Sequence, residues 1–403
     1  MNSEVPANSE VPPEPRPVPL PGGFHAHVGN AGIKDSSDDF TIIAADRPCR
    51  SAAVFTRSRF SGPSVTLSRE HVADGVLQAV VVVSKNANVA TGEVGMADAA
   101  ELAQRVGEVV GCEPGDVLVA STGVIGRPYP MDRIRSHIER IEVPLDELDA
   151  VSVATAMMTT DTHPKVASAK VRTLDGGTAT IVGVAKGVGM IEPDMATMLA
   201  FVLTDAEVPL MELRSGFGEV VDRTFNSLSV DSDTSTSDTA AVLASGVAGE
   251  VDPRGFMVEL QAVCTDLARQ LAADGEGATK LLVVEVTGAR DGAQAKRVAK
   301  SVVNSPLVKT AVHGADPNWG RVAMAIGKCS DDLDIDESHT RISFGDTEVY
   351  PGDSGVDLAA LEIYLGGDEI HIGVDLGIAE GHWTVYGCDL SDGYVRINAD
   401  YTT

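Results

Sequence analysis

The chain has 403 residues, 43% of them hydrophobic and 22% charged, which are the proportions of an ordinary globular protein. This length can bury more than one hydrophobic core, so we expect two or three packed lobes. Acidic residues outnumber basic ones by 59 to 31, giving a net charge of −28. Such a chain repels phosphate backbones and anionic lipids, which argues against nucleic acid and membrane surfaces as partners.

Cysteines and the N-terminal segment indicate the cellular compartment. Five cysteines are scattered without a C-x-x-C pair, which is typical of a reducing cytoplasm and of neither a disulfide scaffold nor a zinc site. No apolar run has the length of a transmembrane helix. Residues 1–22 repeat Asn-Ser-Glu-Val-Pro and then become proline-rich, which predicts a disordered extension and not a secretory signal. We therefore expect a cytoplasmic protein whose globular part begins near residue 23.

Hydrophobic periodicity predicts the secondary structure in chain order. The expected elements are a strand at 79–83, a helix at 96–110, a strand at 117–120 ending in a glycine-punctuated turn at 121–126, a helix at 131–140, strands at 178–184 and 198–203, a helix at 253–273, a strand at 281–286, helices at 294–303 and 317–325, and strands at 341–350, 369–376 and 383–388. Asp-Pro pairs at Asp252 and Asp316 predict two of the helix starts. Because strands and helices do not alternate strictly, we expect an α+β or layered α/β/α architecture and not a Rossmann fold.

Few known catalytic motifs are present. The chain has no phosphate loop, dinucleotide loop, H-E-x-x-H pair or G-x-S-x-G elbow. Residues 186–201 are unusual because glycines and a proline make a loop, while four large apolar residues predict that the loop is buried. Buried irregular backbone is avoided unless the loop has a function. From the residues alone, however, Thr197 is most simply a β-branched residue at the start of the next strand.

A family resemblance gives this loop a different interpretation. Residues 187–199, Gly-Val-Gly-Met-Ile-Glu-Pro-Asp-Met-Ala-Thr-Met-Leu, closely resemble the autoprocessing segment of the ornithine acetyltransferase (glutamate N-acetyltransferase) family. Supporting segments occur in order at 86–92, 121–126, 158–162, 233–239, 275–280, 304–310, 314–321 and 394–403. Some details, such as Lys85 and Ser237, are more similar to the paralogue found in clavulanic acid gene clusters than to the arginine-pathway pattern.

The resemblance implies a self-processing fold like that of N-terminal nucleophile enzymes, with a smaller C-terminal α/β lobe. The bond between Ala196 and Thr197 is expected to break, leaving fragments 23–196 and 197–403. Thr197 then supplies both the nucleophilic hydroxyl and, through its new α-amine, the general base. The family places the oxyanion donors at Thr122 and Gly123. On propensity alone, this pair is an ordinary strand-to-helix turn.

The substrates that the resemblance implies are N-acetylornithine and glutamate, used in a ping-pong cycle without metal or other cofactor. Lys186 is the expected partner of the substrate carboxylate and Glu276 of its distal ammonium. Thr159, Asn398 and the C-terminal Thr403 are also expected at the substrate site, and an α2β2 heterotetramer is expected. Without the resemblance, Lys186 is a surface lysine, Glu276 a solvated loop carboxylate, and the last residues a frayed terminus.

Three other interpretations remain open at this point. An N-terminal-nucleophile amidase or aminopeptidase would share the self-cleavage but release its acyl group to water. A non-catalytic, arginine-related binding protein would keep Thr197 unprocessed. Trp319 and Arg321 could also form a nucleotide-stacking surface, although a helix start at Asp316 is the more economical explanation.

Overall fold

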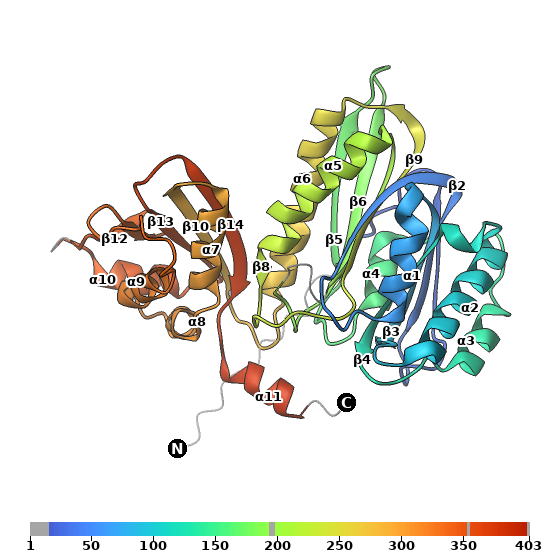
Figure 1. Cartoon of the computed structure of the whole chain (residues 1–403), viewed down its shortest axis with the longest axis horizontal. Helices are drawn as coiled ribbons and strands as arrows, with labels where there is room; N and C mark the ends of the chain where they lie inside the picture. Colours follow the sequence, from blue (N-terminus) through green and yellow to red (C-terminus); the bar gives the residue numbers. More distant parts are fainter. Residues whose placement is uncertain (1–15, 193–197, 353–354, 401–403) are drawn as a thin grey trace.

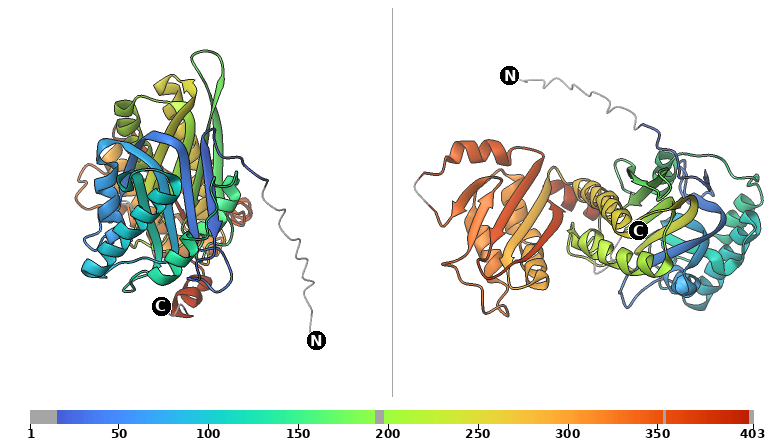
Figure 2. Two further views of the ribbon diagram at one scale, coloured as in Figure 1. Left: turned by 90° about the vertical axis from the view of Figure 1, so that its right-hand side faces the viewer. Right: turned by 90° about the horizontal axis from the view of Figure 1, so that it is seen from above.

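The computed structural model describes residues 16–192, 198–352 and 355–400. The chain forms two lobes, each built on its own β-sheet, and the terminal helix α11 (Asp392–Asp400) lies near their junction (Figure 1). Seen from above, the lobes stand side by side, and α6 (Pro253–Ala273) of the larger lobe packs against β14 (Gly381–Cys388) of the smaller one (Figure 2).

The larger lobe contains an eight-stranded mixed sheet with the order β4-β3-β2-β9-β7-β6-β5, and β1 pairs with β2 beside this path. Its strands are β1 (Phe24–Gly29), β2 (Phe40–Phe55), β3 (Val76–Asn86), β4 (Val117–Val124), β5 (Lys165–Arg172), β6 (Thr178–Lys186), β7 (Leu199–Glu207) and β9 (Thr239–Glu250). The pairs β3–β4 and β7–β9 are parallel and the others are antiparallel. The valine run of β3 is completely buried, as expected of a central strand.

Helices cover both faces of this sheet, which confirms the predicted layered α/β architecture. On one face, α5 (Leu210–Arg223) and α6 bury Phe217, Phe256 and Leu267 against β5, β6, β7 and β9. Each such side chain contributes about 1.5–3 kcal/mol. On the opposite face, α4 (Ala150–Met157) buries Val153 and Met157. The remaining helices of this lobe are α1 (Pro63–His71), α2 (Gly92–Val110) and α3 (Met131–Ile138), with short 3-10 turns at Val72–Asp74, Pro114–Asp116 and Phe225–Ser227.

The smaller lobe contains a six-stranded sheet with the order β12-β11-β13-β10-β14-β8. Its other strands are β8 (Leu228–Ser229), β10 (Leu281–Ala289), β11 (Arg341–Phe344), β12 (Thr347–Tyr350) and β13 (Glu369–Asp375), and its helices are α7 (Gly292–Val303), α8 (Pro306–His313), α9 (Trp319–Gly327) and α10 (Leu358–Leu365). The predicted smaller C-terminal α/β lobe is therefore confirmed. Strand β8 comes from the chain between α5 and β9, so it joins the two lobes.

Most predicted elements are confirmed. The start of one helix agrees with its prediction, and three other predicted details are wrong. Helix α6 begins at Pro253, and the Asp252 carboxylate caps it by accepting the Gly255 N–H at 2.8 Å. The predicted cap at Asp316 is wrong: α9 begins at Trp319, because residues 314–318 form the connection that closes α8. The predicted turn at 121–126 is wrong over 121–124, since β4 continues to Val124 and pairs with β3 through a register shift at Lys85 and Asn86. The expected strand at 341–350 is a hairpin that turns at Gly345.

Two predicted features, the N-terminal extension and the fragment boundary, lie partly or wholly outside the described residues. Residues 1–15 of the expected extension lie there, whereas the Val18 carbonyl already accepts the Ala150 N–H at 2.8 Å. The expected fragment boundary between 196 and 197 also lies outside the described residues. Among the helices that the structure describes, none combines the length and apolar character needed to cross a membrane.

Candidate active site

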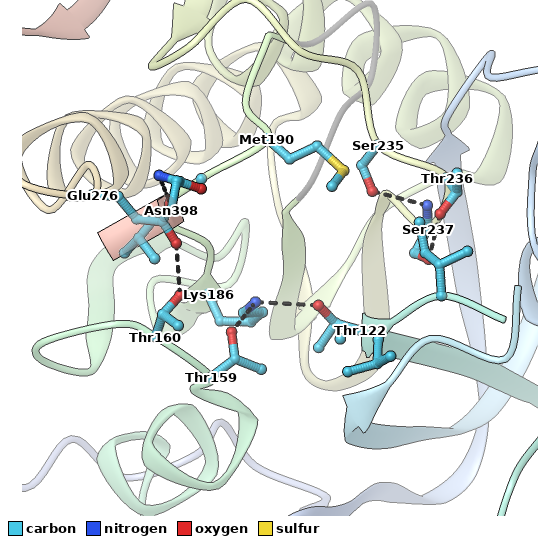
Figure 3. A pocket seen from close by; sticks show the side chains of 15 residues that line it. Thr122, Thr159, Thr160, Lys186, Met190, Ser235, Thr236, Ser237, Glu276 and Asn398 are labelled. Carbon is cyan, nitrogen blue, oxygen red and sulfur yellow. Dashed lines mark hydrogen bonds between the residues drawn. The ribbon is translucent and has the colours of Figure 1, made fainter. Parts of the chain in front are cut away.

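A cavity of about 420 Å³ opens where β4 and β6 end in the larger lobe. It is lined by every predicted site residue that the structure describes, namely Thr122, Gly123, Thr159, Lys186, Glu276 and Asn398 (Figure 3). These residues come from segments almost 280 positions apart in the chain, so the fold itself assembles the site. The remaining predicted residues, Ala196, Thr197 and Thr403, lie outside the described residues.

The pair Thr122–Gly123 reaches the cavity through an irregularity in the sheet. The β3–β4 register shifts at Lys85 and Asn86, and such a bulge re-aims the residues beside it. Gly123 has φ +132°, and a Cβ there would lie 2.2 Å from the Lys85 carbonyl carbon. Only glycine can therefore occupy this position. The local sequence thus fixes a threonine hydroxyl and a glycine backbone together at the cavity wall.

Lys186 is the last residue of β6 and is a buried cation, only 3% exposed. Its ammonium donates hydrogen bonds to Thr159 Oγ1 at 2.8 Å and to Thr122 Oγ1 at 3.2 Å, and lies 3.9 Å from Asp161 Oδ2. Burial lowers the pKa of Lys186, and the Asp161 carboxylate opposes that shift. The interpretation of Lys186 as a surface lysine is therefore wrong.

A buried ion network, which the sequence analysis missed, supports this lysine. The Lys165 ammonium is fully buried between Asp161 Oδ1 at 2.8 Å and Asp274 Oδ2 at 2.6 Å. Asp161 also accepts the Gly187 N–H at 2.7 Å. Burial alone would raise the pKa of Asp161, but Lys186 and Lys165 together hold it below its usual range. Asp161 lies inside the 158–162 segment, and that position was the one signal in the sequence that could have identified it.

Glu276 occupies the opposite side of the cavity and is not an isolated loop carboxylate. Its backbone N–H donates to the Val188 carbonyl at 2.8 Å. Its two carboxylate oxygens accept hydrogen bonds from Thr160 Oγ1 at 3.1 Å and from Asn398 Nδ2 at 3.0 Å. A Cβ on Gly189 would lie 2.5 Å from Glu276 Oε2, so a glycine there lets the carboxylate approach the loop. Asn398 belongs to α11 and is not part of a frayed end.

The third wall consists of residues to which the sequence analysis gave no role. Ser235, Thr236 and Ser237 line it with hydroxyl groups, and Met190 projects its thioether over the cavity from the loop after β6 (Figure 3). Met190 is 41% exposed, so the expectation that it is buried is wrong. These residues lie within the 187–199 and 233–239 segments, which identified the region but not their positions around the cavity.

The cavity therefore presents one cation, one carboxylate and a set of hydroxyl groups. This arrangement matches a small molecule that carries a carboxylate at one end and an ammonium at the other. No group of His, Cys, Asp and Glu that could hold a metal ion occurs within the described ranges.

Trp319 and Arg321 have structural partners elsewhere, since the Trp319 ring packs on Tyr350 and Arg321 donates to the Leu307 carbonyl. These contacts make the nucleotide-stacking interpretation unnecessary.

The chain is similar to known proteins over almost its whole length. The model of the ArgJ family matches residues 25–403. The chain is 56% identical over 390 residues to the glutamate N-acetyltransferase Oat2 of Streptomyces clavuligerus, covering 95% of this chain and 98% of that relative. It is 53% identical over 387 residues to the arginine biosynthesis bifunctional protein ArgJ of Rhodococcoides fascians, covering 95% and 94%. A solved ArgJ structure from Bacillus halodurans is 42% identical, with a TM-score of 0.48, and covers 50% of this chain and 98% of that chain.

Proposed function

The chain belongs to the ArgJ family, and on that premise we propose that it is a glutamate N-acetyltransferase that moves acetyl from N2-acetyl-L-ornithine to L-glutamate. The observation that best supports this function is the placing of Lys186, Glu276, Thr122 and Gly123 around one cavity. Thr197 carries the acetyl group in this proposal, as the family resemblance implies. The enzyme needs neither metal nor cofactor for this reaction.

The proposed activation is cleavage between Ala196 and Thr197, which divides the chain into fragments 1–196 and 197–403. The Thr197 Oγ forms a bond to the Ala196 carbonyl carbon, the C–N bond breaks, and the hydroxyl proton passes to the departing nitrogen. Water then hydrolyses the resulting ester, which restores the hydroxyl and leaves a carboxylate on Ala196. The new α-amine, with a pKa of about 7.7–8.0, is unprotonated often enough near neutral pH to act as a general base.

In the first half-reaction, the amine removes the Thr197 hydroxyl proton as the oxygen attacks the acetyl carbonyl of N-acetylornithine. The tetrahedral intermediate places negative charge on the carbonyl oxygen, toward the Thr122 hydroxyl and the Gly123 backbone N–H. The amine then protonates the leaving nitrogen of ornithine, and the acetyl group stays on Thr197 as an ester. Glutamate attacks this ester through the same steps, so the cycle is ping-pong.

Substrate selection follows from the two charged walls. Lys186 pairs with the substrate α-carboxylate, and Glu276 pairs with the distal ammonium of ornithine. Thr159 is already bonded to Lys186, and Asn398 to Glu276, so each charged residue has a neutral partner that orients it. Thr403 completes the site in this proposal. A cytoplasmic location and an α2β2 assembly of the two fragments complete the proposed function.

Intact mass spectrometry of the purified protein tests the function directly. Two fragments are expected, and incubation with N-acetylornithine should add one acetyl group to the second fragment only. Thr197→Ala should give a single uncleaved chain with no acetyl transfer, at least about 10⁴-fold below the wild-type rate. Full turnover by that variant would refute the proposal. Loss of N-acetylornithine at the same rate without glutamate would instead favour an amidase.

A further inference from the structure

One segment, residues 230–239, which leads into β9, forms hydrogen bonds with the described residues on both sides of positions 193–197. On the upstream side, the Asp231 carboxylate accepts the N–H groups of Met190 at 2.6 Å and Ile191 at 2.8 Å. The Val230 N–H donates to the Ile191 carbonyl at 2.6 Å. These contacts fix the backbone immediately before Glu192.

On the downstream side, the same segment holds Met198, the residue that follows Thr197. Asp238 Oδ1 accepts the Met198 N–H at 2.8 Å, and the Thr239 N–H donates to the Met198 carbonyl at 3.2 Å. Asp238 is 1% exposed, so this bond is shielded from water and from competing partners. Met198 is therefore held on both sides of its backbone.

The upstream anchor also maintains an unfavourable backbone conformation. Met190 has φ +57°, which a residue with a side chain rarely adopts. Two of the three N–H groups that Asp231 accepts belong to Met190 and to the residue after it, so the carboxylate stabilises the conformation at this point. Strained residues of this kind persist where the surroundings determine them and concentrate at functional sites.

We propose that Asp231 and Asp238 are positioning residues for self-cleavage, which fix the two flanks of 193–197 relative to each other. This inference rests on the proposed function, because it concerns the attack of Thr197 on Ala196. Fixing the flanks in advance lowers the entropic cost of bringing the Thr197 hydroxyl to the Ala196 carbonyl. Neither residue touches the acetyl donor in this proposal.

The substitutions follow from how each carboxylate is used. Burial raises the pKa of Asp231 and raises that of Asp238 well above its usual range. Asp238 uses one oxygen toward Met198, and an asparagine carbonyl can accept the same N–H. Asp238→Asn should therefore process within about threefold of the wild-type rate, whereas Asp238→Ala should process about 10–100-fold more slowly. Asp231 uses both carboxylate oxygens, one for the N–H of Met190 and the other for that of Ile191, so Asp231→Ala should be slow and Asp231→Asn intermediate.

The experiment follows cleavage of the full-length chain by intact mass spectrometry after rapid expression and purification. Asp252→Ala is the matched control, because it also removes a 2.8 Å bond from an aspartate to a backbone N–H, at the start of α6. This control should process at the wild-type rate. If either alanine variant does not fold, Asp231→Asn decides the question, because it is expected to process at an intermediate rate and wild-type processing by it would contradict the inference. Wild-type processing by Asp231→Ala and Asp238→Ala would overturn the inference and leave the proposed function intact.

Hydroxylamine separates a defect in ester formation from a defect in ester hydrolysis. It cleaves the ester formed by Thr197 but not the amide that precedes it. If the two aspartates promote ester formation, added hydroxylamine should not restore cleavage of the alanine variants. If hydroxylamine restores wild-type cleavage, the variants form the ester normally and the inference is wrong. An uncleaved wild-type chain would refute the proposed function itself.

Discussion

The two charged walls of the cavity are built differently. Thr122 and Lys186 lie on strands of the eight-stranded sheet, are at most 5% exposed, and are bonded to each other. Glu276 lies on a loop, and its partner Asn398 is exposed on α11, a helix without a single buried residue. One wall is therefore rigid and dry, and the other is half-exposed and supported by the end of the chain.

This difference suggests a division of labour. Charge develops on the acetyl oxygen only during reaction, and fixed donors in a water-poor site stabilise it most. Recognition of a distal ammonium requires only an accessible carboxylate in the right place. Substitutions on the strand wall should therefore lower kcat or kcat/KM strongly, whereas substitutions on the wall of Glu276 and Asn398 should mainly raise KM.

Among the substitutions in the two walls, Lys186→Met should have the largest effect. It removes the proposed carboxylate partner and leaves Asp161 with Lys165 as its remaining buried cation. Breaking a buried charge pair costs about 2–5 kcal/mol, so kcat/KM should fall about 10³-fold. Steady-state kinetics with N-acetylornithine measures this. A fall of less than tenfold would contradict the proposed role of Lys186 as the partner of the substrate carboxylate.

Thr122→Ala should lower kcat about 10²–10³-fold with little change in KM, because it removes one proposed oxyanion donor. Thr160→Ala is the control from the other wall, since its hydroxyl also bonds to a charged residue, Glu276. That control should keep kcat within a few-fold of the wild type. Equal losses of kcat in both variants would contradict the division between the walls.

Glu276→Gln should raise KM for N-acetylornithine about 10–100-fold and leave kcat nearly unchanged. The glutamine carbonyl can still accept from Asn398 and its amide can donate to Thr160 Oγ1, but the charge is lost, and a hydrogen bond to a charged group is worth about 1.5–3 kcal/mol. Asn398→Ala should have a smaller effect on KM, because it removes only a neutral partner of Glu276. A fall in kcat with unchanged KM would assign Glu276 to the chemical step.

The pH dependence should report on the Thr197 amine and on Lys186. The Thr197 amine must be unprotonated, so kcat/KM should rise through about pH 7.7–8.0. Lys186 is charged only below its pKa, and burial lowers that pKa. At alkaline pH, kcat/KM should therefore begin to fall before the pH reaches the usual lysine pKa of about 10.4, and it should then decrease about tenfold per pH unit. Lys186→Arg should move this alkaline limb upward, because guanidinium stays charged. An unchanged alkaline limb in that variant would assign it to another group.

Local signals in the sequence predicted many elements but not the connections among them. Helix α6 was predicted together with its cap because Asp252 and Pro253 act within one turn. Strand β2 was missed because Asp46, Arg47 and Pro48 form an exposed irregularity that interrupts its apolar pattern. Helix α11 was missed because no residue in it is buried, which leaves no hydrophobic periodicity to read.

The candidate site was predictable mainly through the family resemblance. Composition and spacing alone favoured ordinary roles for Lys186 and Glu276. The ion network was missed because Lys165 and Asp274 are 109 positions apart, and no local pattern reports a pairing across that separation. Met190 was expected inside the core because it is apolar, but the loop conformation at φ +57° turns it toward the cavity.

The strand order of the larger sheet determines what a break at position 196 can do to the molecule. Strands β7 and β9 lie after the break, and they are inserted between β2 and β6, which lie before it. Both seams are continuous antiparallel ladders, from Arg50 opposite Ala244 to Phe55 opposite Thr239 and from Ile181 opposite Thr204 to Lys186 opposite Leu199. In a cleaved protein, strands of the second fragment would therefore lie between strands of the first. Cleavage would create a new chain end, and the two fragments would stay associated. Separating the fragments requires breaking both ladders of the central sheet. The cleaved protein should therefore unfold in a single thermal transition.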